Sequence, residues 1–197
     1  MKDEARYPVR RTARLGALLA SGLALAVLEN TILPWGMFLP VPGAKLGLAN
    51  LATLVALEME GFGAAAAVAG GRVLLVAVFT GTLGAPAFWL SLGGAVLSLF
   101  AMGLVRHVPG VSVIGTSMVG AVSHNLGQFL ALGVVLPGAA SPFLLPWLVL
   151  LGLPAGLVTG WLAKRVVGRL MTTAPGAYRN DGHEGDEETS TKDNGQD

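Results

Sequence analysis

Long runs of apolar residues, separated by short polar breaks, fill the chain between residues 15 and 165. A bilayer core of about 30 Å requires about 20 apolar residues in one helix, so such runs are typical of transmembrane helices. The breaks contain Pro, Gly or charged residues that end helices. The pattern predicts an all-α polytopic membrane protein, a bundle of six transmembrane helices. The predicted spans are residues 15–33, 46–57, 62–80, 88–105, 113–136 and 143–163.

The second apolar run is too short to cross a membrane alone, because 12 residues at 1.5 Å each span about 18 Å. Either its helix extends through residues 43–61, or the preceding loop dips into the bilayer against protein. That loop, residues 34–45, contains three Pro, two Gly and several apolar side chains. It suits a rigid cover over the outer mouth of the bundle, and equally an interfacial loop anchored by Trp35.

Charged residues are concentrated at the two ends of the chain. Of the 25 Lys, Arg, Asp and Glu residues, 7 lie in residues 1–14 and 12 in residues 164–197. The 149 residues between them hold only 6, whereas about a quarter or more of a water-soluble surface is charged. We therefore predict a basic cytoplasmic tail (1–14), a transmembrane domain (15–165) and a disordered cytoplasmic tail (166–197).

Orientation follows from the basic residues in the short connections. One side of the membrane would carry the N-terminal tail, Arg106 and the cluster Lys164, Arg165 and Arg169, and the other only Lys45. Because Lys and Arg accumulate on the cytoplasmic side, we expect a multi-pass protein of the cell membrane with both termini in the cytoplasm. The first apolar run has no small-residue cleavage site and is not expected to be a signal peptide.

Composition excludes several kinds of chemistry. No Cys is present, which removes disulfides, thiolate catalysis and cysteine-ligated metals. The chain has no GxxxxGK[ST] loop and is not expected to hydrolyse ATP itself. Every Asp lies in a tail, so the clustered carboxylates that hold Mg²⁺ in prenyl diphosphate chemistry are missing from the membrane segment. We assign no catalytic residue, metal or cofactor, and no basic stripe points to nucleic acid.

Small residues recur on one face of the first predicted helix. At 100° per residue they lie within about 60° of one another, and Glu29 lies nearly opposite. In lipid, small residues four apart allow helices to approach closely. This stripe is either a docking surface for a partner protein or a packing face within the same bundle. Its members are Ala13, Ala17, Ala20 and Ala24.

Polar side chains within the spans are candidates for ligand binding, because a charge at the bilayer centre costs about 2.5–3.5 kcal/mol on insertion scales. Arg72 and His124 lie near the middle of their spans. All the candidates could converge on one cavity open to the outside. Alternatively, Arg72 pairs with Glu29, and the polar residues around His124 only bond neighbouring helices. The candidate ligand-binding residues are Glu29, Lys45, Asn50, Arg72, His124, Asn125 and Gln128.

Three strings carry a resemblance to a known family: PGAKLGLAN at 42–50, GRVL at 71–74 and GAVSHNLGQ at 120–128. Over about residues 13–166 the chain resembles the Gx transporter family, whose members are also labelled heptaprenyl diphosphate synthase component I. That family is similar to the substrate-binding (S) components of energy-coupling factor transporters. The resemblance implies six helices, a first loop over an outward-facing site, and an alanine stripe that meets a transmembrane coupling subunit driven by separate ATPases. The stripe and residues 34–45 match these features in spacing and position.

The sequence supports three functional interpretations. The first is a substrate-capture subunit of an importer for a small anionic molecule, with membrane lipid, a coupling subunit and ATPases as partners. The second is a non-catalytic membrane component of heptaprenyl or polyprenyl diphosphate synthesis in menaquinone metabolism, as the synthase label implies. The third is a structural membrane subunit of a redox complex. Lys45 and Arg72 favour an anionic ligand but do not distinguish a carboxylate from a diphosphate.

The predicted topology can be tested directly, because the chain has no Cys. Single cysteines replacing Gly36 and Gly138 should react with an impermeant thiol reagent added outside intact cells. Gly185→Cys should react only after the cells are opened. Labelling of Gly185→Cys in intact cells would contradict cytoplasmic termini.

Overall fold

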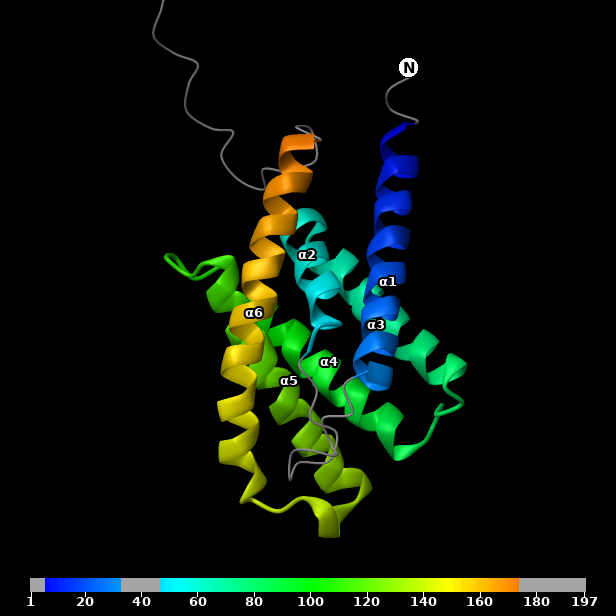
Figure 1. Ribbon diagram of the computed structural model, residues 1–197, viewed down its shortest axis with the longest axis vertical. Coiled ribbons are helices and arrows are strands. Elements are labelled where there is room, and N and C mark those ends of the chain that lie inside the picture. Colours follow the sequence, from blue (N-terminus) through cyan, green and yellow to red (C-terminus); the bar gives the residue numbers. More distant parts are fainter. Residues whose placement is uncertain (1–5, 33–46, 174–197) are drawn as a thin grey trace, which may run out of the picture.

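The computed structural model describes residues 6–32 and 47–173, and every regular element in these ranges is helical (Figure 1). The start of α1 and the end of α6 lie at the same end of the bundle (Figure 1). Five of the helices are long and apolar enough to cross a membrane. The predicted all-α class is therefore confirmed for the described residues, and the five apolar helices fit a membrane bundle. The elements are α1 (Arg6–Ile32), α2 (Asn50–Glu60), α3 (Phe62–Phe79), α4 (Pro86–Val105), α5 (Val113–Val135), the 3₁₀ turn η2 (Pro137–Ala139) and α6 (Leu144–Thr173).

Helix α2 is the exception among the predicted spans. Its 11 residues cover about 16 Å, roughly half of a bilayer core. It contacts all five other α-helices, and eight of its residues are buried. A helix that is apolar on all sides is typically enclosed by protein. The described helices thus provide five candidate spans and one short central helix, so the predicted count of six spans is not confirmed.

The predicted boundaries agree closely with α3, α4 and α5 and differ at the two ends of the chain. Helix α1 already begins at Arg6, within the segment predicted as a basic tail, and α6 continues to Thr173 instead of ending near Ala163. Lys and Arg end the apolar run but are good helix formers, so the helices continue beyond the apolar segment. The predicted loop at residues 34–45 lies outside the described residues.

Glycines set the spacing of the three helices α4, α5 and α6. On α6, Gly152, Gly156 and Gly160 lie four residues apart against the backbone of α5. A Cβ on Gly156 would lie 2.5 Å from Cα of Met118, closer than real side chains approach. Small residues at this spacing let transmembrane helices pack backbone to backbone.

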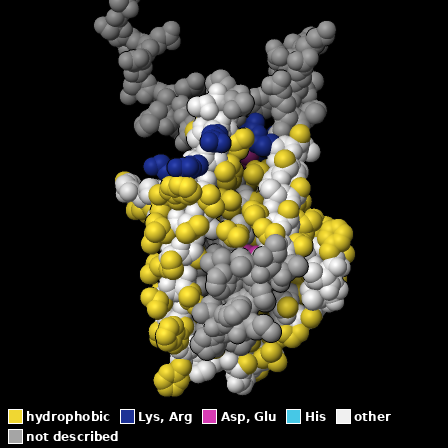
Figure 2. All heavy atoms as spheres, viewed as in Figure 1, with side chains coloured by type: hydrophobic (Ala, Val, Ile, Leu, Met, Phe, Trp, Pro, Cys, Tyr) yellow, Lys and Arg dark blue, Asp and Glu magenta, His cyan; other side chains and the backbone are white. Residues whose placement is uncertain are grey.

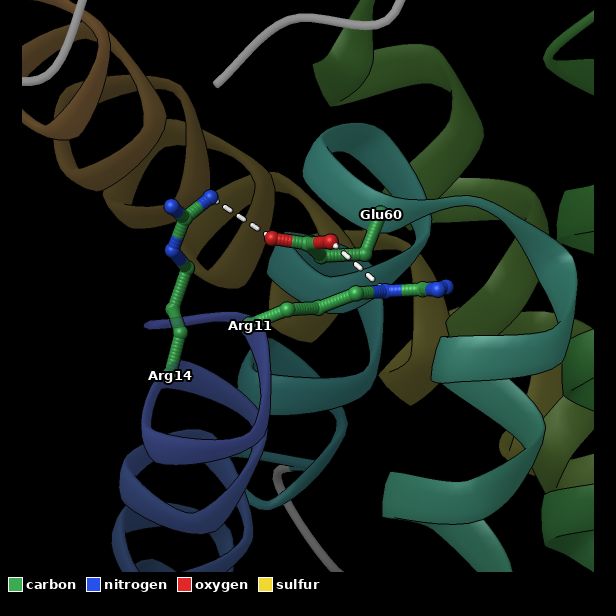
Figure 3. A network of polar contacts seen from close by, with 3 residues as sticks. All are labelled: Arg11, Arg14 and Glu60. Atoms are coloured by element: carbon green, nitrogen blue, oxygen red, sulfur yellow. Dashed lines mark hydrogen bonds and ion pairs between the residues drawn. The ribbon is translucent and has the colours of Figure 1, made fainter. Parts of the chain in front are cut away.

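The end of α2 nearest the termini is held by charged side chains (Figure 3). Arg11 and Arg14 reach from α1 to Glu60, with Nε–Oε2 and Nη1–Oε1 distances of 3.2 and 2.6 Å. Arg106, after α4, donates to the carbonyl oxygen of Leu57. The same carbonyl also accepts the backbone N–H of Gly61 at 3.2 Å, so the Arg106 bond adds a second donor at the end of the helix and ties the segment after α4 to α2.

The surface of the bundle is apolar along its sides and basic at one end. Figure 2 shows hydrophobic side chains covering the sides of the described helices, with Lys and Arg side chains gathered toward the end where α1 begins and α6 ends. On α6, Trp161 is about half exposed and the Arg165 guanidinium lies 4.0 Å from its ring centroid. Tryptophan and basic side chains in this arrangement are typical of the border between lipid and water.

We predict that Gly156→Leu disrupts the contact between α5 and α6, because the new side chain would overlap the backbone of Met118. Overpacking of this kind costs about 1–3 kcal/mol or more. The melting temperature in detergent should fall clearly. Gly168→Leu is the matched control, since nothing lies within 4 Å of a Cβ at that position. Equal melting temperatures for the two variants would contradict the packing seen here.

Replacing Glu58 and Glu60, at the end of α2, by glutamine should change the thermal stability in opposite directions near neutral pH. Glu60→Gln removes both ion pairs and should lower the melting temperature in detergent by about 2–5 °C. Burial raises the pKa of the Glu58 carboxyl above its usual value of 4.5, and the Arg106 charge opposes this only in part. A raised pKa in the folded state means that stability falls as the pH rises above 4.5.

Glu58→Gln should therefore stabilise the protein near neutral pH and have little effect below pH 4.5. Thermal unfolding of both variants across this pH range measures the two effects. Destabilisation by Glu58→Gln at neutral pH would show that the attraction to Arg106 outweighs the cost of burial.

Candidate functional site

A small cavity of about 30 Å³ lies at the beginning of α2, where five helices meet. Each of α1, α3, α4 and α5 contributes at least one side chain to its wall, so the cavity exists only in the assembled bundle. About half of the lining residues are polar or charged. The lining residues are Ala26, Glu29, Gly47, Ala49, Asn50, Arg72, Ser91 and His124.

Four of the seven predicted ligand-binding residues thus line one cavity: Glu29, Asn50, Arg72 and His124. They come from four different helices and lie up to 95 positions apart between Glu29 and His124. Each is buried in the bundle. Lys45 lies outside the described residues. The geometry is that of a polar site enclosed by apolar helices.

Glu29 positions the entry into α2. Its carboxylate is 2% exposed, and its Oε1 accepts the backbone N–H of Gly47 at 2.7 Å. Gly47 has a positive φ of 74°, which favours glycine, and its carbonyl accepts from Asn50 N in the turn that starts the helix. A carboxylate near a helix N-terminus also complements the partial positive charge there.

Arg72 lies in the middle of α3, on the side of that helix that faces α1. It is 8% exposed, and its Nε and Nη2 atoms are buried without a hydrogen-bond partner in the described part of the chain. Its Cδ packs beside Gly22 of α1, where an added Cβ would lie 3.6 Å away, an ordinary contact distance. Arg72 and Glu29 form no ion pair within the 4.0 Å limit among the described residues. The guanidinium therefore keeps unused donors beside the cavity.

Asn50 and His124 are held in place by α4. Asn50 Nδ2 donates to Oγ of Ser98 at 2.9 Å, and Ser98 is completely buried. His124 fits against Gly94, where an added Cβ would lie 2.8 Å from its Cε1. The position of both side chains is thus fixed by small residues of α4.

Asn125 and Gln128, predicted beside His124, do not line this cavity. Asn125 Nδ2 donates to the carbonyl oxygen of Leu148 at 2.8 Å, which ties α5 to α6. Gln128 packs against Gly94 of α4. Asn125 points away from His124 because one step along a helix turns the side chain by about 100°, whereas Gln128, four residues on, stays on the His124 face one turn further along.

Sequence reasoning missed the contribution of α4. Ser91 lines the cavity, and Ser98 and Gly94 support Asn50 and His124. Serine and glycine are common in transmembrane helices and carry no charge, so they give no signal of a site. One sequence signal could have revealed this face of α4. Ser91, Gly94 and Ser98 are three and four residues apart, which places them on one side of the helix.

The cavity wall offers donors and acceptors and no acidic cluster. Among the described residues, no group of three or more His, Cys, Asp or Glu side chains could hold a metal ion. The guanidinium of Arg72 is the strongest donor and the carboxylate of Glu29 the strongest acceptor on the wall. Such a wall can bind a small polar group and orient it by hydrogen bonds.

The fold is a helical bundle with five helices long and apolar enough to cross a membrane, and a polar cavity lies among its helices. The chain belongs to the family described as heptaprenyl diphosphate synthase component I, whose model matches residues 18–166. This confirms the resemblance found in the sequence under that label. No curated protein and no solved structure gives a significant match.

Proposed function

We propose that this protein is the substrate-capture membrane subunit of an energy-coupling factor type importer for a small anionic molecule. One observation carries the proposal: Arg72 is buried at mid-span beside a cavity, with donors unused by the described residues. A buried charge in a membrane helix is costly and is typically retained for a ligand, an ion or a partner charge. In this proposal Lys45, Asn50, Arg72 and His124 bind the ligand, Glu29 lines the site and holds the start of α2, and Asn125 and Gln128 support the site.

The outer face of α1 supports a partner in the membrane. The four alanines of the stripe are exposed, whereas Leu18, Gly22, Ala26 and Glu29 on the opposite side of the helix are buried. Exposure of the stripe among the described helices supports a docking role over a packing role. Small side chains leave a smooth surface that a second transmembrane protein can approach closely. The exposed residues are Ala13, Ala17, Ala20 and Ala24.

The proposed partners are a transmembrane coupling subunit and ATPases, because the chain has no nucleotide-binding loop of its own. The proposed location is the cell membrane with both termini in the cytoplasm. This orientation places the charged end of α2 with Glu60 inside and the cavity toward the outer side. A ligand captured from outside would then bind within the outer half of the bundle.

A second candidate function is a non-catalytic membrane component of heptaprenyl or polyprenyl diphosphate synthesis. The description of the family supports it. The chain itself supplies no Asp between residues 4 and 180, so a partner would have to bind the Mg²⁺ and diphosphate of the reaction.

The two candidates differ in what accompanies the protein. We predict that the tagged protein, purified from its native membrane in mild detergent, carries a transmembrane coupling subunit and ATPases. Ala17→Leu with Ala20→Leu should remove these partners and leave the isolated protein folded, because the larger side chains block close approach. Ala67→Leu, at an exposed position on α3, is the matched control. Mass spectrometry of the purified complexes provides the measurement.

Recovery of a prenyl diphosphate synthase subunit in place of ATPases would favour the second candidate. Failure of the double variant to fold would show that the stripe is a packing face.

A further inference from the structure

We propose that the cavity beside Arg72 binds a single carboxylate group, held side-on by Nε and Nη2 of that residue. The inference rests on the proposed function only in taking this cavity as the ligand site. It goes further in naming the chemical group that is bound. It also identifies the ligand, and not Glu29, as the anionic partner of Arg72.

The first argument is the geometry of the unused donors. In an arginine side chain, the Nε–H and one N–H of Nη2 lie on the same edge of the planar guanidinium. These are the two atoms of Arg72 that are buried without a hydrogen-bond partner in the described residues. Such an edge matches the two oxygens of a carboxylate, which it binds through two parallel hydrogen bonds.

The second argument is that Glu29 is already engaged. Its Oε1 accepts from Gly47 N at 2.7 Å, and it forms no ion pair with Arg72. Glu29 holds the start of α2, whereas Arg72 lies on another wall of the same cavity. A ligand carboxylate would supply the partner that Glu29 does not. Its binding would also be assisted by the N-terminal end of α2, where Ala49 and Asn50 line the cavity.

The third argument is size and charge. A volume of about 30 Å³ holds about two water-sized groups, which suits one carboxylate. A diphosphate has two phosphoryl groups and a higher negative charge. The described wall offers it one guanidinium, with the Glu29 carboxylate repelling it. The observations thus favour a carboxylate over a diphosphate.

Acetate and inorganic pyrophosphate are the probes for the test. The full chain is purified in detergent with ¹⁵N-labelled arginine, and the Nε–H signal of Arg72 is assigned by its loss in Arg72→Lys. Acetate should shift this signal in a saturable manner at constant ionic strength, and pyrophosphate should not. Arg72→Lys keeps the charge but lacks the two-nitrogen edge, so acetate binding followed by saturation-transfer NMR should weaken at least tenfold. Arg165→Lys, at an exposed position on α6, should bind acetate like the wild type.

Glu29→Gln provides the second arm. Gln keeps an oxygen that can accept from Gly47 N and removes the negative charge, so acetate should bind several-fold more tightly than to the wild type. Weaker acetate binding in Glu29→Gln, or tighter binding of pyrophosphate than of acetate to the wild type, would overturn the proposal. Absence of any acetate effect on the Arg72 signal would overturn it as well. These outcomes are independent of whether a coupling subunit co-purifies, so the failure of this inference and that of the proposed function can be told apart.

Discussion

The short helix α2 imposes the main constraint on this structure. It contacts all the other α-helices and covers about half of a bilayer core, so its first residues are buried within the bundle while its Glu60 end lies at the charged end of the molecule. Backbone groups that end inside a membrane bundle need partners, because lipid supplies none. At one end Glu29 accepts from Gly47 N, and at the other Arg106 donates to the Leu57 carbonyl.

The cavity follows from that constraint. The cavity lies at the start of α2, and the helices around that start supply the polar wall. The two ends of α2 then differ in chemistry. At Glu60 two arginines satisfy a carboxylate, whereas at the cavity the donors of Arg72 stay unused by the described residues. One helix bundle thus holds both a charge paired by two arginines and a buried guanidinium with two donors unpaired among the described helices.

Glycines let the helices on one side of the cavity pack in direct backbone contact. Gly93 and Gly127 bring α4 and α5 into backbone contact, and Gly156 does the same for α5 and α6. Gly94 leaves the space that His124 occupies. Helix α1 contributes Glu29 from its inner face and leaves its alanine stripe exposed on the other. One face of α1 therefore lines the cavity while the opposite face stays exposed in the described part of the chain.

The sequence by itself determined the class of fold and most helix boundaries, because apolar length and Pro or Gly breaks act locally along the chain. It also identified Glu29, Asn50, Arg72 and His124 as candidates, since polar residues at membrane depth are costly wherever they occur. Only the tertiary structure decided which of them meet, separating His124 from Asn125 and adding Ser91. The direction of a side chain and the identity of its neighbours depend on helix rotation and close packing between segments far apart in the chain, which no local pattern contains.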